Sequence, residues 1–165
     1  MSTEDRKINL LMVDDEEEFL NSLAERLETR DFEVTTATEG AKAVAAAAEG
    51  LFDVAIIDLN MPGMDGMALL KILKEKHKFL EVIILTGFGK VASYKEATEL
   101  GAFSYLEKPF DMDQLLEELK NAYQTRLKRK FEQDQKRQEE LAALSLGSSP
   151  LGILRALKQM DDDQK

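Results

Sequence analysis

The sequence predicts a doubly wound α/β fold, with a five-stranded parallel sheet and an extended C-terminal helix. Short apolar segments of strand length recur five times, and each is followed by a segment of helical length and pattern. The apolar segments are nearly continuous, which is typical of parallel strands that crossover helices cover on both faces. A chain of 165 residues has room for one compact domain and an appendage.

Each element has its own local signal. The expected strands are 8–13 (INLLMV), 32–37, 54–57, 82–85 and 104–106, and the expected helices are 16–29, 41–48, 67–77, 91–100 and a fifth that begins near Asp111. Asp65 and Gly66 are suited to cap the third helix, and Gly101 follows the fourth. The pair Lys108–Pro109 should end the last strand, because proline cannot donate to the ladder.

The chain changes character after residue 123. Residues 1–123 carry a net charge of −12 and residues 124–165 a net charge of +2, and no further strand pattern appears. We therefore expect one folded domain over 1–123 and a helical extension over 124–165. The last helix should continue to about Gly147, and Ser149–Pro150 resembles the start of another short helix. Its apolar residues need a docking surface, either its own domain or, the option that we favour, a second copy in a homodimer.

Composition and charge exclude several classes of protein. With no cysteine, disulfides, thiolate nucleophiles and cysteine zinc sites are absent. A net charge of −10 opposes nonspecific binding to nucleic acid or anionic lipid. No apolar run has the length of a membrane span, and the N-terminus lacks the pattern of a signal peptide. We expect a soluble cytoplasmic protein without a nucleic-acid or membrane partner, and we interpret the basic cluster at 126–130 as a solvated helix.

Polar residues follow the strands at one edge of the predicted sheet, where doubly wound folds build their sites. These residues are Asp14, Asp15, Asp58, Thr86 and Lys108. Clustered carboxylates repel one another and need a counter-charge. Because the available ligands are oxygens, Mg²⁺ or Mn²⁺ is favoured over Zn²⁺.

The same residues suit phosphoryl transfer. The carboxylate of Asp58 can act as the nucleophile and become an acyl phosphate. Lys108 can pair with the phosphoryl oxygens, and Thr86 can donate a hydrogen bond to them.

Four motifs in the chain resemble those of response-regulator receiver domains of two-component signalling. They are LMVDDEEEF at 11–19, IIDLNMPGMDG at 56–66, ILTGFG at 84–89 and GAFSYLEKPF at 101–110, within a resemblance that covers 7 to about 123. The resemblance implies a flavodoxin-like receiver fold and phosphoryl transfer from a sensor histidine kinase to Asp58. It also implies Mg²⁺ bound by Asp15, Asp58 and the backbone carbonyl of Asn60, with Asp14 helping through water.

The resemblance further implies a switch formed by Thr86 and Tyr105. After phosphorylation the hydroxyl would move toward the phosphoryl group, and the aromatic ring would turn inward behind it. The surface of the fourth helix, fifth strand and fifth helix would then signal to an unknown downstream protein. Asn60 and Phe88 occupy positions that tune phosphoryl lifetime in the family. Such a domain is a phosphoacceptor that assists its own phosphorylation and dephosphorylation, not an enzyme in the usual sense.

The same residues allow alternative functions. As a phosphorelay intermediate, the protein would pass the phosphoryl group on. A phosphatase of the haloacid dehalogenase type also forms an aspartyl phosphate, but it needs a catalytic aspartate where this chain has Asn60. A purely structural module with a vestigial pocket fits the complete set of pocket residues poorly. His77, the single histidine, is interpreted as a surface residue.

Overall fold

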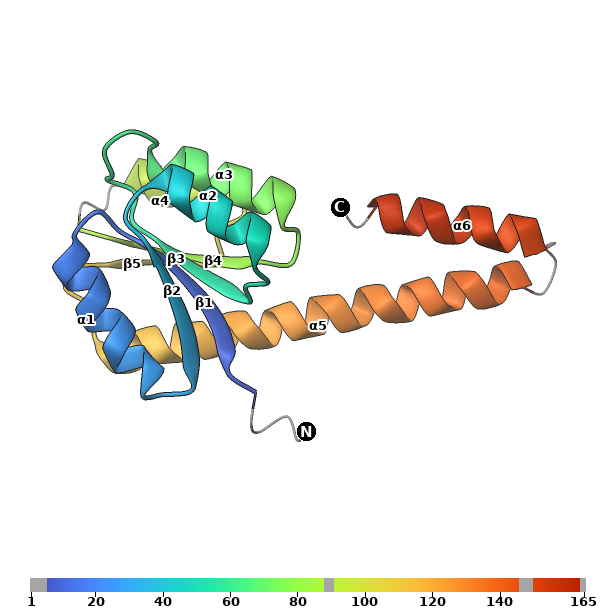
Figure 1. Ribbon diagram of the computed structural model, residues 1–165, viewed down its shortest axis with the longest axis horizontal. Coiled ribbons are helices and arrows are strands. Elements are labelled where there is room, and N and C mark those ends of the chain that lie inside the picture. Colours follow the sequence, from blue (N-terminus) through green and yellow to red (C-terminus); the bar gives the residue numbers. More distant parts are fainter. Residues whose placement is uncertain (1–5, 88–90, 146–149, 164–165) are drawn as a thin grey trace.

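The computed structural model describes residues 6–87, 91–145 and 150–163. The strands are β1 (Ile8–Val13), β2 (Phe32–Ala37), β3 (Val54–Ile57), β4 (Glu81–Thr86) and β5 (Ser104–Glu107), and the helices are α1 (Glu17–Glu28), α2 (Gly40–Glu49), α3 (Gly66–Lys76), α4 (Val91–Glu99), α5 (Met112–Ser145) and α6 (Pro150–Asp163). All strand pairs are parallel, in the order β2-β1-β3-β4-β5. The predicted fold class is confirmed (Figure 1).

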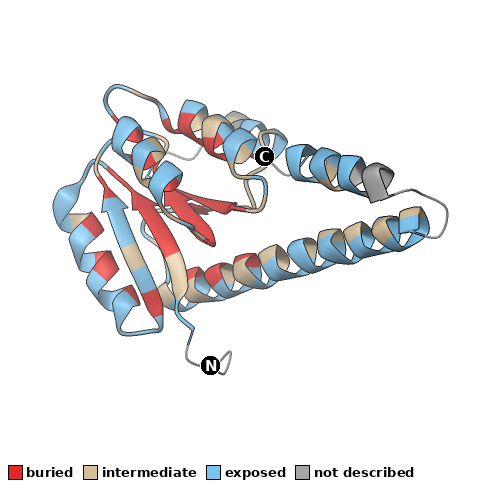
Figure 2. Ribbon diagram, turned by 45° about the vertical axis from the view of Figure 1, so that its right-hand side comes forward, coloured by how far each residue is buried: buried red, intermediate tan, exposed pale blue. Residues whose placement is uncertain are grey.

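Helices cover the sheet on both faces, as the continuous apolar strands predicted. Alternate residues of β1 serve the two cores: Leu10 and Met12 pack with α1 and α5, whereas Leu11 and Val13 pack on the face of α2, α3 and α4. Successive side chains of a strand point to opposite faces of the sheet, so a strand that is apolar throughout must be covered on both faces. Figure 2 shows the buried residues concentrated in the sheet and on the helix sides that face it.

The strand register brings the carboxyl ends of four strands to one edge. Val13 of β1 pairs with Ile57 of β3, Ile57 pairs with Ile84 of β4, and Thr86 pairs with Glu107 of β5. The residues that follow these strands are therefore neighbours in space. The expected site lies at this edge.

The ends of β1 to β5 and of α1 to α4 lie within one residue of the predicted bounds. Strand β4 is longer than the predicted 82–85, since it includes Glu81 and Thr86, and both side chains are buried. Gly101 follows α4 with a φ of +99°, a conformation that glycine adopts without a steric cost. At the start of α5, the Asp111 carboxylate accepts a hydrogen bond from the backbone N–H of Asp113 at 3.1 Å.

Helix α5 runs without interruption through the predicted boundary at 123/124. Its described buried residues all lie in the first part, at Leu115, Leu119 and Ala122. The boundary itself stays a prediction. None of the described helices combines the length and the apolar character that crossing a bilayer requires.

Two arginines fasten the middle of α5 to the sheet. Arg126 Nε lies 2.9 Å from Asp53 Oδ1, and Arg129 Nη1 lies 2.5 Å from Glu81 Oε1. Both carboxylates are buried, and a buried charge needs a partner. The interpretation of the basic cluster as a solvated helix is therefore wrong for these two residues.

Helix α6 begins at Pro150, as the sequence predicted, and folds back along α5 (Figure 1). Arg137 of α5 forms an ion pair with Asp161 of α6. The expected docking surfaces were the folded domain or a second copy, whereas the observed contact is with the extended part of α5. Gly147 and Ser149 lie outside the described residues. The homodimer stays a prediction.

Candidate functional site

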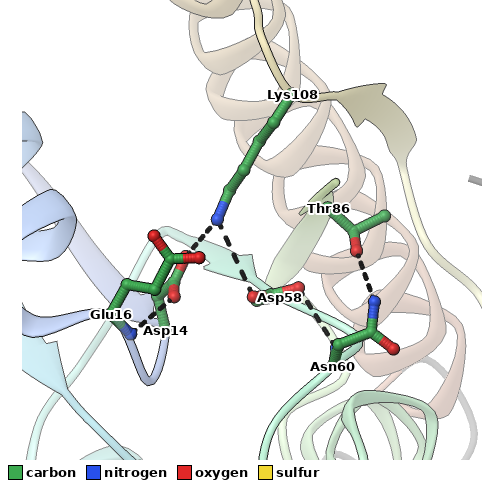
Figure 3. Close-up of polar contacts among 6 residues, drawn as sticks. All are labelled: Asp14, Glu16, Asp58, Asn60, Thr86 and Lys108. Carbon is green, nitrogen blue, oxygen red and sulfur yellow. Dashed lines mark hydrogen bonds and ion pairs between the residues drawn. The ribbon is translucent and has the colours of Figure 1, made fainter. Parts of the chain in front are cut away.

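The predicted site residues meet at the carboxyl edge of the sheet. Figure 3 shows the polar contacts there among Asp14, Glu16, Asp58, Asn60, Thr86 and Lys108. Asp14 and Asp15 follow β1, Asp58 follows β3, and Thr86 is the last residue of β4. Lys108 follows β5, and the peptide bond to Pro109 is cis.

Three carboxylates form the acidic part of the site. Carboxylate oxygens of Asp14, Asp15 and Asp58 all lie within 4.8 Å of one another. Asp14 and Asp58 are buried, whereas Asp15 is exposed. The backbone N–H of Glu16 donates to Asp14 Oδ1 at 2.9 Å, which fixes the orientation of this carboxylate.

Lys108 supplies the positive charge of the site. Its Nζ lies 2.6 Å from Asp14 Oδ2 and 3.7 Å from Asp58 Oδ2. The ammonium also lies 4.1 Å from the centroid of the Phe19 ring on α1, where the ring's negative face attracts a cation. Sequence reasoning missed Phe19, because nothing local indicates that α1 reaches the end of β5.

Asp58 occupies the centre of the arrangement. Its Oδ1 accepts a hydrogen bond from the backbone N–H of Asn60 at 3.1 Å. The Asn60 side-chain amide donates to Thr86 Oγ1 at 3.2 Å. Burial raises the pKa of Asp58, and the charge of Asp14 acts in the same direction; the Asn60 N–H, Lys108 and Thr86 lower the pKa without reversing the net rise.

The loop after Asp58 depends on a close backbone approach at Gly66. A Cβ added to Gly66 would lie 2.5 Å from the carbonyl oxygen of Asp58. The sequence indicated only a helix cap here, and the cap is present, since the Asp65 carboxylate accepts from the N–H of Ala68 at 3.0 Å. The structure adds that α3 begins directly against the backbone of the site aspartate.

Tyr105 lies beside the site on β5, where it is half-buried against α4. Its ring packs edge-on against Tyr94, with the centroids 5.6 Å apart. Sequence reasoning did not identify Tyr94, which is 55% exposed. Thr86 is fully buried. Phe88, the other residue expected near the phosphoryl group, lies outside the described residues.

The donor set suits a hard divalent cation. Three carboxylates in close contact with a single ammonium leave an excess of negative charge, and all of the candidate ligands are oxygens. Mg²⁺ prefers such ligands. Asp14, Asp15 and Asp58 are therefore the residues that fit this ion.

The fold and the acidic site together define a receiver-type signalling domain. Residues 10–120 match the family profile described as the response regulator receiver domain. The chain belongs to this family. The match disfavours the alternative of a haloacid dehalogenase-type phosphatase.

Similar proteins support the assignment. The chain is 36% identical over 125 residues to an NtrX-like response regulator from Rickettsia bellii, an alignment that covers 74% of this chain and 26% of the relative. It is 41% identical over 103 residues to the DNA-binding transcriptional regulator NtrC from Escherichia coli, covering 62% of this chain and 22% of the relative. The chain thus spans about a quarter of the length of these relatives.

Solved structures give the same result. A CheY-like response regulator receiver domain protein from Methanospirillum hungatei superposes with a TM-score of 0.72 at 27% identity, covering 74% of this chain and 98% of that one. A receiver domain protein from Clostridium thermocellum gives a TM-score of 0.68 at 34% identity, covering 71% and 94%.

Proposed function

We propose that Asp58 is the phosphoryl acceptor of this response regulator and that a sensor histidine kinase supplies the phosphoryl group. The observation that carries the proposal is the position of Asp58: a buried carboxylate held by the Asn60 N–H, with Lys108 Nζ 3.7 Å away. The proposal includes a cytoplasmic location and no enzymatic activity beyond the protein's own phosphorylation and dephosphorylation.

The transfer is a substitution at phosphorus. A carboxylate oxygen of Asp58 forms the new P–O bond while the bond between phosphorus and the donor imidazole nitrogen breaks. The bonding electron pair leaves with the imidazole, which is neutral after departure if it entered as the protonated phosphohistidine. Lys108 is within reach of the transferred phosphoryl oxygens and offsets their charge.

Asp14, Asp15 and Asp58 would hold Mg²⁺, with the backbone carbonyl of Asn60 as a further proposed ligand. When bound, the ion supplies the positive charge that lets an anionic phosphodonor approach three carboxylates. Lys108 already neutralises part of this charge through Asp14.

Thr86 and Tyr105 form the proposed switch. The Thr86 hydroxyl accepts a hydrogen bond from Asn60. Its own proton interacts with the Asp58 carboxylate before transfer and would be donated to a phosphoryl oxygen after transfer. A hydrogen bond that exists in only one state biases a two-state equilibrium. The affected surface is formed by α4, β5 and α5, where Tyr105 packs on Tyr94, and its downstream partner would recognise the change.

Phosphorylation by a small donor tests the acceptor. Incubation of the full chain with acetyl phosphate and Mg²⁺ should give a single phosphate adduct, detected by intact-mass spectrometry and removed by hydroxylamine, as expected of an acyl phosphate. Asp58→Asn should abolish the adduct, whereas the exposed Asp134→Asn should retain it. A hydroxylamine-stable adduct, or one that persists in Asp58→Asn, would contradict the proposal.

A further inference from the structure

A small cationic pocket lies at the edge of the sheet opposite Asp58. It has a volume of about 230 Å³ and is formed by the ends of α2 and α3, the segment that leads into β4, and the middle of α5. Five of its lining residues are basic: Lys76, His77, Lys78, Arg126 and Lys130. None of the described residues that line it is acidic. In a chain with a net charge of −10, this concentration of positive charge stands out from the rest of the surface.

Most of this positive charge is uncompensated. Arg126 is already paired with Asp53. Within the described part of the chain, no ion pair is formed by Lys76, Lys78 or Lys130, and all three are exposed. Burial lowers the pKa of His77, and the charge of Lys76 adds a smaller repulsion in the same direction. An anion would relieve this repulsion.

The pocket also has an apolar side, formed by Phe52, Phe79 and Leu80. Its volume is below the roughly 300–1,000 Å³ of sites that enclose a small-molecule ligand. It has room for one large apolar side chain. A ligand that fits both features carries an apolar side chain flanked by negative charges.

The chain itself presents a segment with this chemistry to the adjoining surface. A neighbouring cavity of about 470 Å³ shares Lys78 and Phe79 with the cationic pocket, and the α6 residues Met160 and Asp163 line it. Asp161, between them, is the residue paired with Arg137. An acidic helix end with an apolar residue therefore already lies on this side of the molecule.

We propose that the cationic pocket binds an acidic helical segment of a partner protein, with an apolar side chain against Phe52 and Phe79 and carboxylates on Lys76, Lys78 and Lys130. The net negative charge of the whole chain disfavours nucleic acid and anionic lipid as occupants. The pocket is at the amino ends of β3 and β4, whereas Asp58 and Thr86 are at their carboxyl ends. Binding is therefore separate from the phosphoryl chemistry.

A labelled peptide with the sequence of residues 150–163, PLGILRALKQMDDD, is the probe, and fluorescence anisotropy with the full chain is the assay. Replacing its aspartates with asparagine should weaken binding. Lys76→Glu combined with Lys130→Glu should lower the affinity by at least about tenfold, since each reversal turns an exposed attraction into a repulsion. Lys71→Glu, an exposed change on the same helix as Lys76 and outside the pocket, should bind like the parent.

Two further variants separate this site from its neighbours. Lys136 lines the neighbouring cavity that α6 residues also line and does not line the cationic pocket, so Lys136→Glu should leave the affinity unchanged. Asp58→Asn should also bind normally, because it removes the proposed phosphoryl acceptor without touching the pocket. If the charge-reversed pair fails to fold by circular dichroism, the milder Lys76→Gln with Lys130→Gln replaces it, with a smaller loss of affinity expected.

Several results would overturn the proposal. The first is equal peptide affinity of the parent and the Lys76/Lys130 variants. The second is a loss of peptide affinity in Lys136→Glu, which would mean that the peptide displaces α6. The third is a changed peptide affinity in Asp58→Asn. Tighter binding of a single-stranded oligonucleotide or of phosphatidylglycerol vesicles, lost with the same lysines, would assign the pocket to a different ligand.

Discussion

Replacing Asp58 with asparagine should stabilise the fold at neutral pH in the absence of metal. Burial raises the pKa of Asp58 above its ordinary value of 3.8, so the folded state holds the proton more tightly than the unfolded chain does. Ionised Asp58 therefore costs stability. The cost is present above the raised pKa, shrinks as the pH falls through it, and is gone below the unfolded value. The amide keeps the shape and an oxygen that can accept from the Asn60 N–H.

The distances in the site set the size of the effect. At an effective dielectric constant of about 20, an Asp14–Asp58 separation of at most 4.8 Å means a repulsion of at least about 3.5 kcal/mol. The attraction of Lys108 at 3.7 Å is about 4.5 kcal/mol on the same scale. The third carboxylate, Asp15, is exposed, so solvent screens its repulsion. The repulsion and the attraction are therefore of similar size, and the cost of desolvating Asp58, the largest contribution to its raised pKa, decides the sign. We expect a net gain of roughly 1–2 kcal/mol for the variant, which raises Tm by about 2–8 °C in a chain of this size.

Thermal unfolding with EDTA measures the cost of the ionised Asp58 carboxylate, and thermal unfolding with Mg²⁺ measures the stabilisation by the metal. Without metal, Asp58→Asn should melt above the parent, and the difference should vanish at low pH. At a Mg²⁺ concentration of about one hundred times Kd, the parent should gain about 2.7 kcal/mol, and the variant less. The exposed Asp134→Asn should melt like the parent throughout. A metal-free Asp58→Asn that melts below the parent at neutral pH would refute the electrostatic reasoning.

Three further predictions concern the packing and the switch. Arg126→Met should lower the unfolding free energy by about 3–5 kcal/mol in urea titrations, because Asp53 then stays buried without its ion pair; adding Asp53→Asn should recover part of the loss, and a parental midpoint for the single variant would contradict this role. Gly66→Ala should cost about 1–3 kcal/mol, because the new Cβ would lie 2.5 Å from a backbone oxygen, and an unchanged unfolding midpoint would show that the loop adapts freely. Thr86→Ala should still be phosphorylated but lose the phosphorylation-dependent change in hydrogen exchange of α4 and β5; a parental exchange response would remove Thr86 from the switch.

The sequence alone was sufficient to predict the fold class and to predict which residues lie together at the carboxyl edge of the sheet. Five apolar strands alternating with helices lead to a parallel sheet, and parallel strands place their carboxyl ends together. Asp14, Asp58, Thr86 and Lys108 could therefore be grouped although they are far apart in the chain. The turn at Gly101 and the helix cap at Asp65 could also be predicted, because turn and cap signals depend on neighbouring residues only.

Tertiary structure alone decided the contacts between segments that are distant in sequence. Phe19 lies against Lys108, Arg126 pairs with Asp53, and α6 folds back on α5. No local pattern encodes such pairs, since each depends on how the helices sit on the sheet. The cationic pocket is the clearest case: the basic residues of 126–130 look like a solvated helix face in sequence, and only the approach of α5 to the ends of α2 and α3 places some of them around an apolar recess.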